Sequence, residues 1–127
     1  MNSEIRSFRK LVDCYLEETH KLFPQDASEL GLREFDALLG DNDARVHLTH
    51  RRLLTETLRE VEALSDHAFT GDDWLDRRGF LAMLRTGLLF NTREHWRINP
   101  QVHCDTAVNA IFSLLIRNAE RLPKALP

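Results

Sequence analysis

Apolar residues recur at intervals of three and four along most of this chain, and that spacing limits the fold more than any other feature. In the first segment, the apolar residues that share one helical face are Ile5, Phe8, Leu11, Val12, Tyr15, Leu16, Leu22 and Phe23. An α-helix completes a turn in about 3.6 residues, so this spacing places them on one side. The pattern predicts a helix that begins after a cap at Asn2 or Ser3 and ends before Pro24.

Two further segments show the same periodicity. Asp43 is placed to cap a second helix, whose apolar stripe covers residues 46–64. Another helix follows Pro100, and Asp105 or Thr106 is its expected cap. The residues expected on the inner face of this last helix are Ala107, Val108, Ile111, Leu114, Leu115 and Ala119.

The helix predicted over residues 72–94 has a different pattern, because its apolar residues do not keep to one face. We expect it to open near Thr70 and to finish with His95 and Trp96. Its apolar residues surround the helix axis: Trp74, Leu75, Phe80, Leu81, Met83, Leu84, Leu88, Leu89 and Phe90. A helix of this kind needs neighbours on several sides. It is therefore either the centre of the fold or a helix that further protein covers.

Residues 24–42 are rich in turn signals and connect the first two helices. Asp26 is a candidate cap for a single turn closed by Gly31, and a second break follows at Gly40. The sequence shows neither strand-like alternation nor an internal repeat. It predicts a single all-α domain over residues 1–127, a bundle of about four main helices with an irregular crossover at residues 24–42.

Charge and composition exclude several classes of protein. The formal net charge is −3, from 17 basic and 20 acidic residues of mixed order, so there is no basic stripe for nucleic acid. No apolar run approaches the roughly 18 residues that a membrane span needs. Cys14 and Cys104 suggest no disulfide framework, and a cytoplasmic location is the simplest interpretation.

The segment HWRINPQVHCD gathers residues that can bind metal. Zinc needs three or four ligands that converge, and His95, His103 and Cys104 are the candidates. An inverted zinc-peptidase motif, H-x-x-E-H, would end at His95, but Asn91 stands at its first position. We favour a structural interpretation in which Asn99–Pro100 makes a turn and Cys104 packs, with a metal-binding protein as the alternative.

Arg93 and Arg97 lie close to the predicted junction of the last two helices, and Arg117 lies further along the last helix. Arginines at such junctions bind the carbonyl groups at helix ends. A guanidinium also suits the carboxylate of a substrate. We favour the structural clamp and keep substrate binding as the alternative.

Three stretches in order carry a resemblance to a known family. They are FRKLVDCYLEETHKLFPQDASELGLREFDALLGD, WLDRRGFLAMLRTGLLF and REHWRINPQVHCDTAVNAIFSLLIR. Together they resemble the N-terminal part of large bacterial proteins of the domain-of-unknown-function 885 family. The features that carry the resemblance are Phe8, Tyr15, Pro24, Leu30–Gly31, the stretch Asp36…Leu39…Asp41, Arg93, Trp96, Asn99–Pro100, Leu114–Leu115 and Arg117. His103 departs from the pattern, since a tyrosine is expected shortly after the Asn–Pro pair.

The resemblance implies a helical N-terminal module of a longer protein. Members are similar to zinc metallopeptidases of the H-E-x-x-H type, whose metal-binding helix lies far downstream, so no catalytic, cofactor or metal residue is expected in this chain. Zinc would belong to the full-length parent, in which these helices would form a wall or lid of the cleft. The expected partner is the missing C-terminal domain, or a second copy through the apolar helix 72–94. The alternative is a standalone helical protein that acts by homodimerisation or protein binding.

Overall fold

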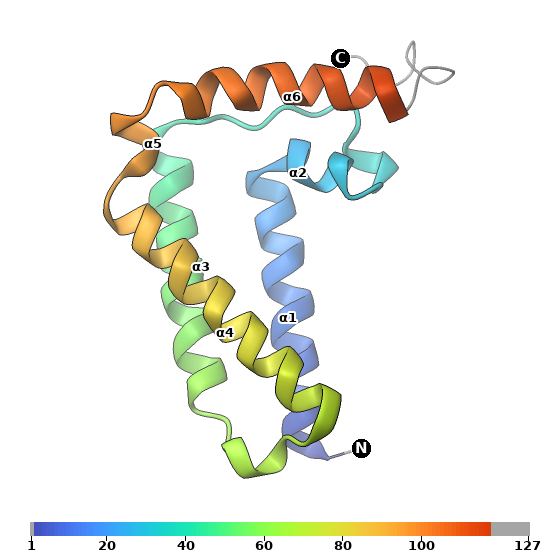
Figure 1. Ribbon diagram of the computed structural model, residues 1–127, viewed down its shortest axis with the longest axis vertical. Coiled ribbons are helices and arrows are strands. Elements are labelled where there is room, and N and C mark those ends of the chain that lie inside the picture. Colours follow the sequence, from blue (N-terminus) through green and yellow to red (C-terminus); the bar gives the residue numbers. More distant parts are fainter. Residues whose placement is uncertain (1, 118–127) are drawn as a thin grey trace.

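The computed structural model describes residues 2–117, and within this range every regular element is a helix. The all-α prediction is therefore confirmed, with four long helices joined by short ones (Figure 1). In chain order the elements are α1 (Ser3–Leu22), α2 (Pro24–Glu29), η1 (Arg33–Phe35), α3 (Ala44–Glu62), η2 (Asp66–Ala68), α4 (Gly71–Thr92), α5 (His95–Ile98) and α6 (Gln101–Arg117). None of the described helices is both long and apolar enough to cross a membrane.

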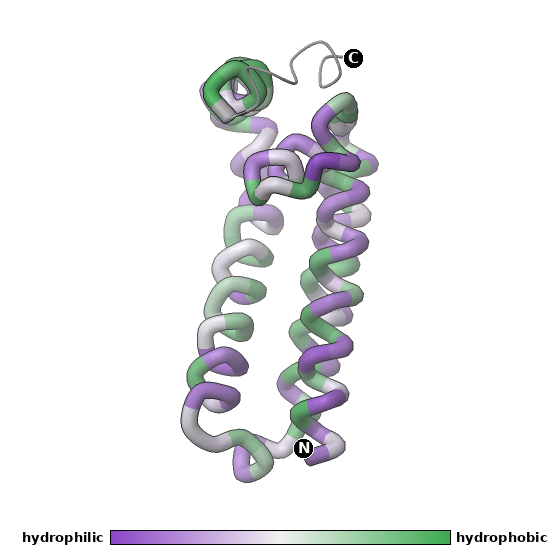
Figure 2. Tube along the Cα trace, turned by 90° about the vertical axis from the view of Figure 1, so that its right-hand side faces the viewer, coloured by the Kyte–Doolittle hydropathy of each residue, from purple (hydrophilic) through white to green (hydrophobic). Residues whose placement is uncertain are grey.

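Helix α3 is the central element of the bundle, because it packs on both α1 and α4. Helix α6 crosses the same end of these long helices and rests on α2 (Figure 1). Figure 2 shows the helices from the side, with α6 seen nearly end-on at the top and largely apolar. The irregular crossover predicted at residues 24–42 contains α2 and η1 and leads into α3.

The core lies between α1, α3 and α4 and contains a group of aromatic rings. Phe8 makes edge-to-face contacts with Phe69 and Phe80, at ring centroid distances of 5.6 and 5.9 Å. Tyr15 contacts Phe80 in the same way at 5.5 Å. Such contacts contribute about 0.5–1.5 kcal/mol each beyond the burial of area. Leu54, Val61, Leu81 and Leu84 complete the core.

The two predicted N-terminal caps of the first helices are confirmed. Asn2 Oδ1 accepts a hydrogen bond from the Glu4 amide at 2.9 Å, and Asp43 Oδ1 accepts one from the Val46 amide at 3.1 Å. Each carboxamide or carboxylate oxygen satisfies an amide that has no partner within the helix. The caps fix where α1 and α3 begin.

Two other predicted caps are wrong. Asp26 lies inside the first turn of α2, which begins at Pro24, because proline favours the first helical position. Asp105 and Thr106 lie inside α6, which begins at Gln101. Its first amide is capped instead by Asn99, whose Oδ1 accepts from Gln101 N at 3.1 Å.

The helix predicted over residues 72–94 is present as α4 but ends earlier than expected. Glu94 adopts a left-handed backbone conformation with φ 51°, which breaks the helix after Thr92. His95 and Trp96 therefore do not finish this helix and belong to the separate short helix α5. The break turns the chain toward α6.

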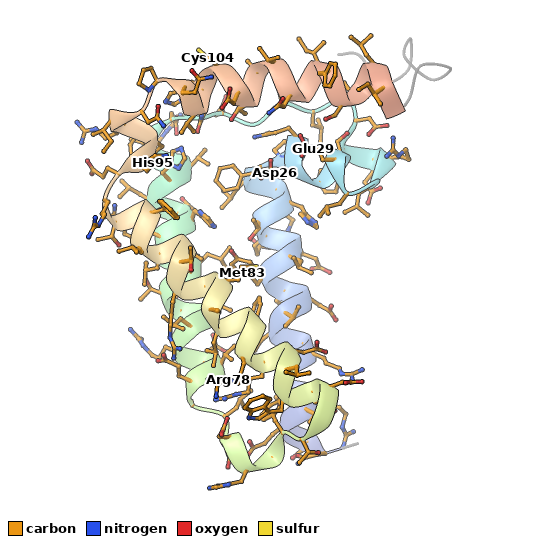
Figure 3. All side chains as sticks on the ribbon, viewed as in Figure 1. Asp26, Glu29, Arg78, Met83, His95 and Cys104 are labelled. Atoms are coloured by element: carbon orange, nitrogen blue, oxygen red, sulfur yellow. The ribbon has the colours of Figure 1, made fainter. Side chains whose placement is uncertain are left out.

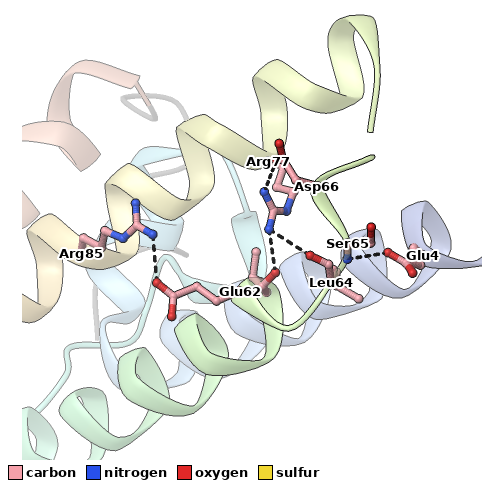
Figure 4. Close-up of polar contacts among 8 residues, drawn as sticks. Glu4, Glu62, Leu64, Ser65, Asp66, Arg77 and Arg85 are labelled. Atoms are coloured by element: carbon pink, nitrogen blue, oxygen red, sulfur yellow. Dashed lines mark hydrogen bonds and ion pairs between the residues drawn. The ribbon is translucent and has the colours of Figure 1, made fainter. Parts of the chain in front are cut away.

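Arg77 anchors the turn between α3 and α4 from inside the fold (Figure 4). Its Nη2 donates to the carbonyls of Val61 and Leu64 at 3.3 and 3.1 Å, and its Nη1 donates to Asp66 Oδ1 at 2.7 Å. These carbonyls belong to the end of α3, where helical partners are missing. Arg77 also lies over the Phe69 ring, 5.3 Å from its centre.

Much of the apolar surface of α4 and α6 is not covered within the described residues. On α4, the side chains of Leu75, Met83, Leu89 and Phe90 are exposed, as expected for a helix that is apolar all round. On α6, the buried inner face consists of Ala110 and Leu114, so the prediction is confirmed for Leu114. The other residues predicted there within the described range are exposed, namely Ala107, Val108, Ile111 and Leu115, and so are the neighbouring Phe112 and Ile116. Ala119 lies outside the described residues.

Candidate functional site

An open pocket of about 340 Å³ lies where the ends of α1, α3 and α4 meet α5 and α6. Three imidazoles line it, from His47 and His50 on α3 and His95 on α5. Asp26 and Asn91 are polar neighbours in the lining. The other walls are mainly aromatic and include Tyr15, Phe23, Phe90 and Trp96. We call this the histidine pocket. Mostly apolar walls with a few convergent polar groups are typical of ligand sites.

His47 connects the pocket to α6 through a chain of hydrogen bonds. Its ring stacks on Trp96 with centroids 4.4 Å apart, and its Nε2 contacts Asn42 Oδ1 at 2.5 Å. Asn42 Nδ2 contacts His103 Nδ1 at 2.7 Å, and His103 Nε2 contacts the Trp96 carbonyl at 2.7 Å. Since the amide nitrogen can only donate, His103 accepts at Nδ1 and donates from Nε2.

His50 and Tyr15 form the deeper part of the pocket wall. Tyr15 Oη lies 3.4 Å from His50 Nε2, and the Phe23 ring meets His50 edge-on at 5.1 Å. Burial, reinforced by the nearby His47, lowers the pKa of His50 below 6.5. Burial also lowers the pKa of His47, with His103 acting in the same direction and Asp43 opposing it. Desolvation disfavours the charged imidazole in both cases.

Tyr15 and Asp26 also have shifted pKa values. Burial raises the pKa of Tyr15 above 10.0, and a hydrogen bond with Thr19 partly opposes this. Asp26 is exposed over part of its surface, yet desolvation raises the pKa of its carboxyl above 3.8, with a further contribution from Glu29. Several shifted groups around one pocket mark a candidate site for a ligand.

Asn91 fixes the floor of the pocket to α3. Arg51 donates from Nε to Asn91 Oδ1 at 2.8 Å and from Nη2 to the Asn91 carbonyl at 3.0 Å. Asn91 Nδ2 in turn donates to the His47 carbonyl at 2.8 Å. The residue is only 6% exposed. In the sequence, Asn91 stands out as the missing ligand of a zinc motif, although its spacing from Leu84 and Leu88 places it on the buried stripe of α4.

The three candidate metal ligands are not assembled into one site. His95 lines the histidine pocket, and His103 is linked to His47 through Asn42. Cys104 is exposed on the outer side of α6, so the expectation that it packs is wrong (Figure 3). Among residues 2–117, no group of three or more histidine, cysteine, aspartate or glutamate side chains is arranged to hold a metal ion.

The candidate arginines also lie apart from one another. Arg97 pairs with Glu94 at 2.9 Å and lies 6.0 Å from the centre of the Trp96 ring. Arg93 is exposed just after α4, and Arg117 ends α6, with a side chain outside the described residues. Carbonyl clamps of the expected kind occur at Arg51 and Arg77. Both project from within helices toward the α3–α4 contact, and neither lies at the junction before α6 where such clamps were predicted.

The histidine pocket combines mostly apolar walls with a few polar groups, an arrangement that suits ligand binding. Burial lowers the pKa of His47 and of His50, which favours their neutral imidazoles, and the Tyr15 phenol lies 3.4 Å from His50 Nε2. A phenol whose pKa is raised is a poor nucleophile, because its anion is disfavoured. Comparison with known proteins adds no assignment: no family model, curated protein or solved structure matches this chain.

Proposed function

We propose that this chain is a non-catalytic helical module that binds another protein segment through α6. In the context of the resemblance described above, the module would be a wall or lid of the cleft in a zinc-metallopeptidase-like protein, and the catalytic H-E-x-x-H region would lie outside this chain. Zinc would then be held by the parent protein. The observation that carries the proposal is the exposed apolar side of α6.

That side, the α6 face, consists of Val108, Ile111, Phe112, Leu115 and Ile116. At about 100° per residue, the five side chains fall within an arc of about 140°. Ala110 and Leu114, which are buried, lie on the opposite side of the helix toward α2. The α6 face therefore points away from the bundle, as in an amphipathic helix that docks into an apolar groove.

The energy available from covering the α6 face is large compared with the stability of a small domain. Phe112 is 56% exposed and the other four side chains are between 47% and 64% exposed. Burying a whole side chain of this type stabilises by about 1.5–3 kcal/mol, so covering the outer half of five contributes on the order of 5 kcal/mol. An exposed patch of this kind on a soluble protein marks an interaction site.

Extending the gene sequence downstream of codon 127 tests the module proposal first. The expected result is an open frame that continues for several hundred codons and encodes H-E-x-x-H. A stop codon directly after Pro127 would overturn it, and would favour the standalone protein that acts by homodimerisation.

Hydrogen exchange on the longer chain then tests the docking of α6. Amides on α6 should exchange more slowly in the longer chain than in the 127-residue chain, because the covering segment suppresses local opening. Phe112→Asp should destabilise the longer chain and leave the unfolding of the 127-residue chain nearly unchanged. Asn109→Asp adds the same charge at an exposed polar position and serves as the control. Equal protection of α6 in both chains would contradict the proposal.

A peptidase assay completes the test of the non-catalytic role. The purified 127-residue chain should hydrolyse no peptide substrate in the presence of zinc. Chelator-sensitive turnover by this chain alone would overturn the assignment.

A further inference from the structure

Besides the α6 face, the bundle has another uncovered apolar surface, which lies on helix α4. The α4 face consists of uncharged residues on the outer side of the helix: Leu75, Gly79, Ala82, Met83, Thr86, Leu89 and Phe90. All seven residues are exposed, including Gly79, which has no side chain. At about 100° per residue they fall within an arc of about 120°. Figure 3 shows Met83 midway along the helix.

The spacing within this face is that of a helix that pairs with another helix. Leu75, Gly79, Ala82, Thr86 and Leu89 alternate intervals of four and three residues, as do the apolar positions of a coiled coil. The first and last of these are leucines and the middle ones are small. Two such helices can approach closely at the middle while the larger side chains pack at the ends.

Gly79 has no role in the internal packing of this chain. A Cβ atom added at this position would meet no atom within 4 Å. Glycine weakens the interior of a helix, so its presence there has no explanation within the described fold. A close helix–helix contact on the outer side supplies one.

The charges at the two ends of the α4 face are opposite. Asp72 begins α4 and Arg93 follows it, and both are exposed. Neither forms an ion pair within residues 2–117, whereas the neighbouring Asp73 is paired with Arg9 at 2.9 Å. A parallel pair of α4 helices would bring like charges together at both ends. An antiparallel pair brings Asp72 to Arg93 of the partner subunit at both ends.

We propose that two copies of this chain form a symmetric dimer through antiparallel α4 helices, with Ala82 opposite Met83 of the partner subunit. In this single register, outside the central pair, a small residue lies opposite a small one, a large apolar residue lies opposite a large one, and opposite charges meet. It places Gly79 opposite Thr86, Leu75 opposite Phe90 and Asp72 opposite Arg93, each contact occurring twice. Such self-complementarity is what a two-fold interface requires, because one surface must supply both halves. The occupant of the α4 face is therefore a second copy of this chain.

A groove beside the α4 face adds to the contact. It lies between α1 and α4, has a volume of about 660 Å³, and is lined by Val12, Leu75, Gly79 and Met83 among others. In the proposed register, Phe90 of the partner subunit lies beside Leu75 and fills this groove. The aromatic side chain thereby becomes an anchor of the type that dominates interface energetics.

Sedimentation equilibrium of the 127-residue chain at low salt gives the first measurement. The expected result is a reversible dimer. A chain that stays monomeric up to its solubility limit would overturn the proposal and leave the α4 face to another segment of the parent. Gly79→Glu should give a monomer whose thermal stability is at least that of the unassociated parent chain, because the position is open and glutamate favours helix.

Charge reversal tests the register directly. Asp72→Arg alone and Arg93→Asp alone should each weaken the dimer about tenfold or more, since each places like charges together at both ends. An equal mixture of the two variants should form a heterodimer, because every end contact is then attractive. The double variant Asp72→Arg/Arg93→Asp should also dimerise. Failure of both the mixture and the double variant to associate would refute the antiparallel register.

The control for this experiment lies on α6. Phe112→Asp should leave the dimer intact, since the α6 face takes no part in it. Loss of the dimer in this variant would overturn the α4 assignment. The proposal is therefore independent of the module function, which depends on α6 and on the length of the reading frame.

Discussion

Replacing Arg77 with methionine tests how this fold holds its α3–α4 turn. Methionine keeps most of the buried stem but removes the guanidinium. The carbonyls of Val61 and Leu64 then lose their donor, and Asp66 loses its ion partner. The variant separates two explanations for a buried arginine: that it satisfies helix-end carbonyls, or that it forms a salt bridge.

The exposure of the two partners determines which contribution is larger. The Arg77 side chain is 8% exposed and that of Asp66 is 62% exposed, so water readily replaces the guanidinium at Asp66. The ion pair contributes at most about 1 kcal/mol for this reason. A buried carbonyl without a donor costs about 1–3 kcal/mol, and methionine regains part of that through apolar packing. We expect Arg77→Met to lower the free energy of unfolding by about 2–3 kcal/mol, two or more times the effect of Asp66→Asn.

Chemical denaturation followed by circular dichroism measures this difference. The midpoint should shift while the dependence on denaturant stays constant, and the melting temperature should fall by roughly 10 °C for a domain of this size. Asp66→Asn is the matched control, because asparagine still offers an oxygen to Nη1 and removes only the charge. If Asp66→Asn proves as destabilising as Arg77→Met, the salt bridge is the main contribution and the carbonyl argument fails.

Three further predictions concern the pocket and its surroundings. Burial lowers the pKa of His47 and His50 below 6.5, so below that pH the unfolded chain binds more protons than the folded chain. This contribution to stability should be full above about pH 6.5 and should be lost as the pH falls below it. His50→Gln should reduce the pH dependence in denaturation curves. An unchanged pH dependence in that variant would contradict the assignment. Glu94→Gly should raise stability by about 1 kcal/mol, because glycine accepts a left-handed conformation, whereas Glu94→Ala should give no such gain. Asn91→His completes the spacing H-x-x-E-H, yet calorimetry should detect no tight zinc binding, since the helix breaks at Glu94 and the two histidines would not share one helical face.

The periodicity of the sequence located all four long helices, but it could not identify which apolar side of a helix would find a neighbour. On α6, Ile111 and Leu115 have the same character as the buried Leu114, and nothing local distinguishes them. The choice depends on α2, which covers only the side with Ala110 and Leu114. Burial of this kind is set by tertiary contacts, and those are not encoded in the spacing of one segment.

Polar residues on a buried stripe caused a second kind of error. Arg77 and Asn91 share the inner side of α4 with Phe80 and Leu84, at helical spacing. Charged and amide residues usually lie on the surface, so the apolar pattern does not include these two. A buried polar residue is nevertheless informative, because it needs partners. The helix break is a third case, since a glutamate rarely adopts a left-handed conformation and Glu94 shows no local signal for one.

The histidine pocket was beyond local reasoning for a different reason. His47 and His50 come from α3, whereas His95 comes from α5, and only the path of the chain through α4 brings them together. In the sequence, His95 groups with His103 and Cys104, because they are close in the chain. The structure groups it with residues that are distant in the chain, so sequence proximity was a poor guide to the candidate site.

The α4 face and the α6 face bind different partners in these proposals, and the geometry allows both partners to bind at the same time. Helix α6 follows the C-terminal end of α4, beyond α5 (Figure 1). In an antiparallel pair of α4 helices, the two α6 helices therefore lie at opposite ends of the dimer and remain available to a covering segment. Binding of an apolar dye distinguishes the two surfaces: Asp72→Arg, which separates the subunits, should increase dye binding by uncovering α4, and Phe112→Asp should decrease it in the intact dimer. If subunit separation left dye binding unchanged, the α4 face would not be the surface that the dimer covers.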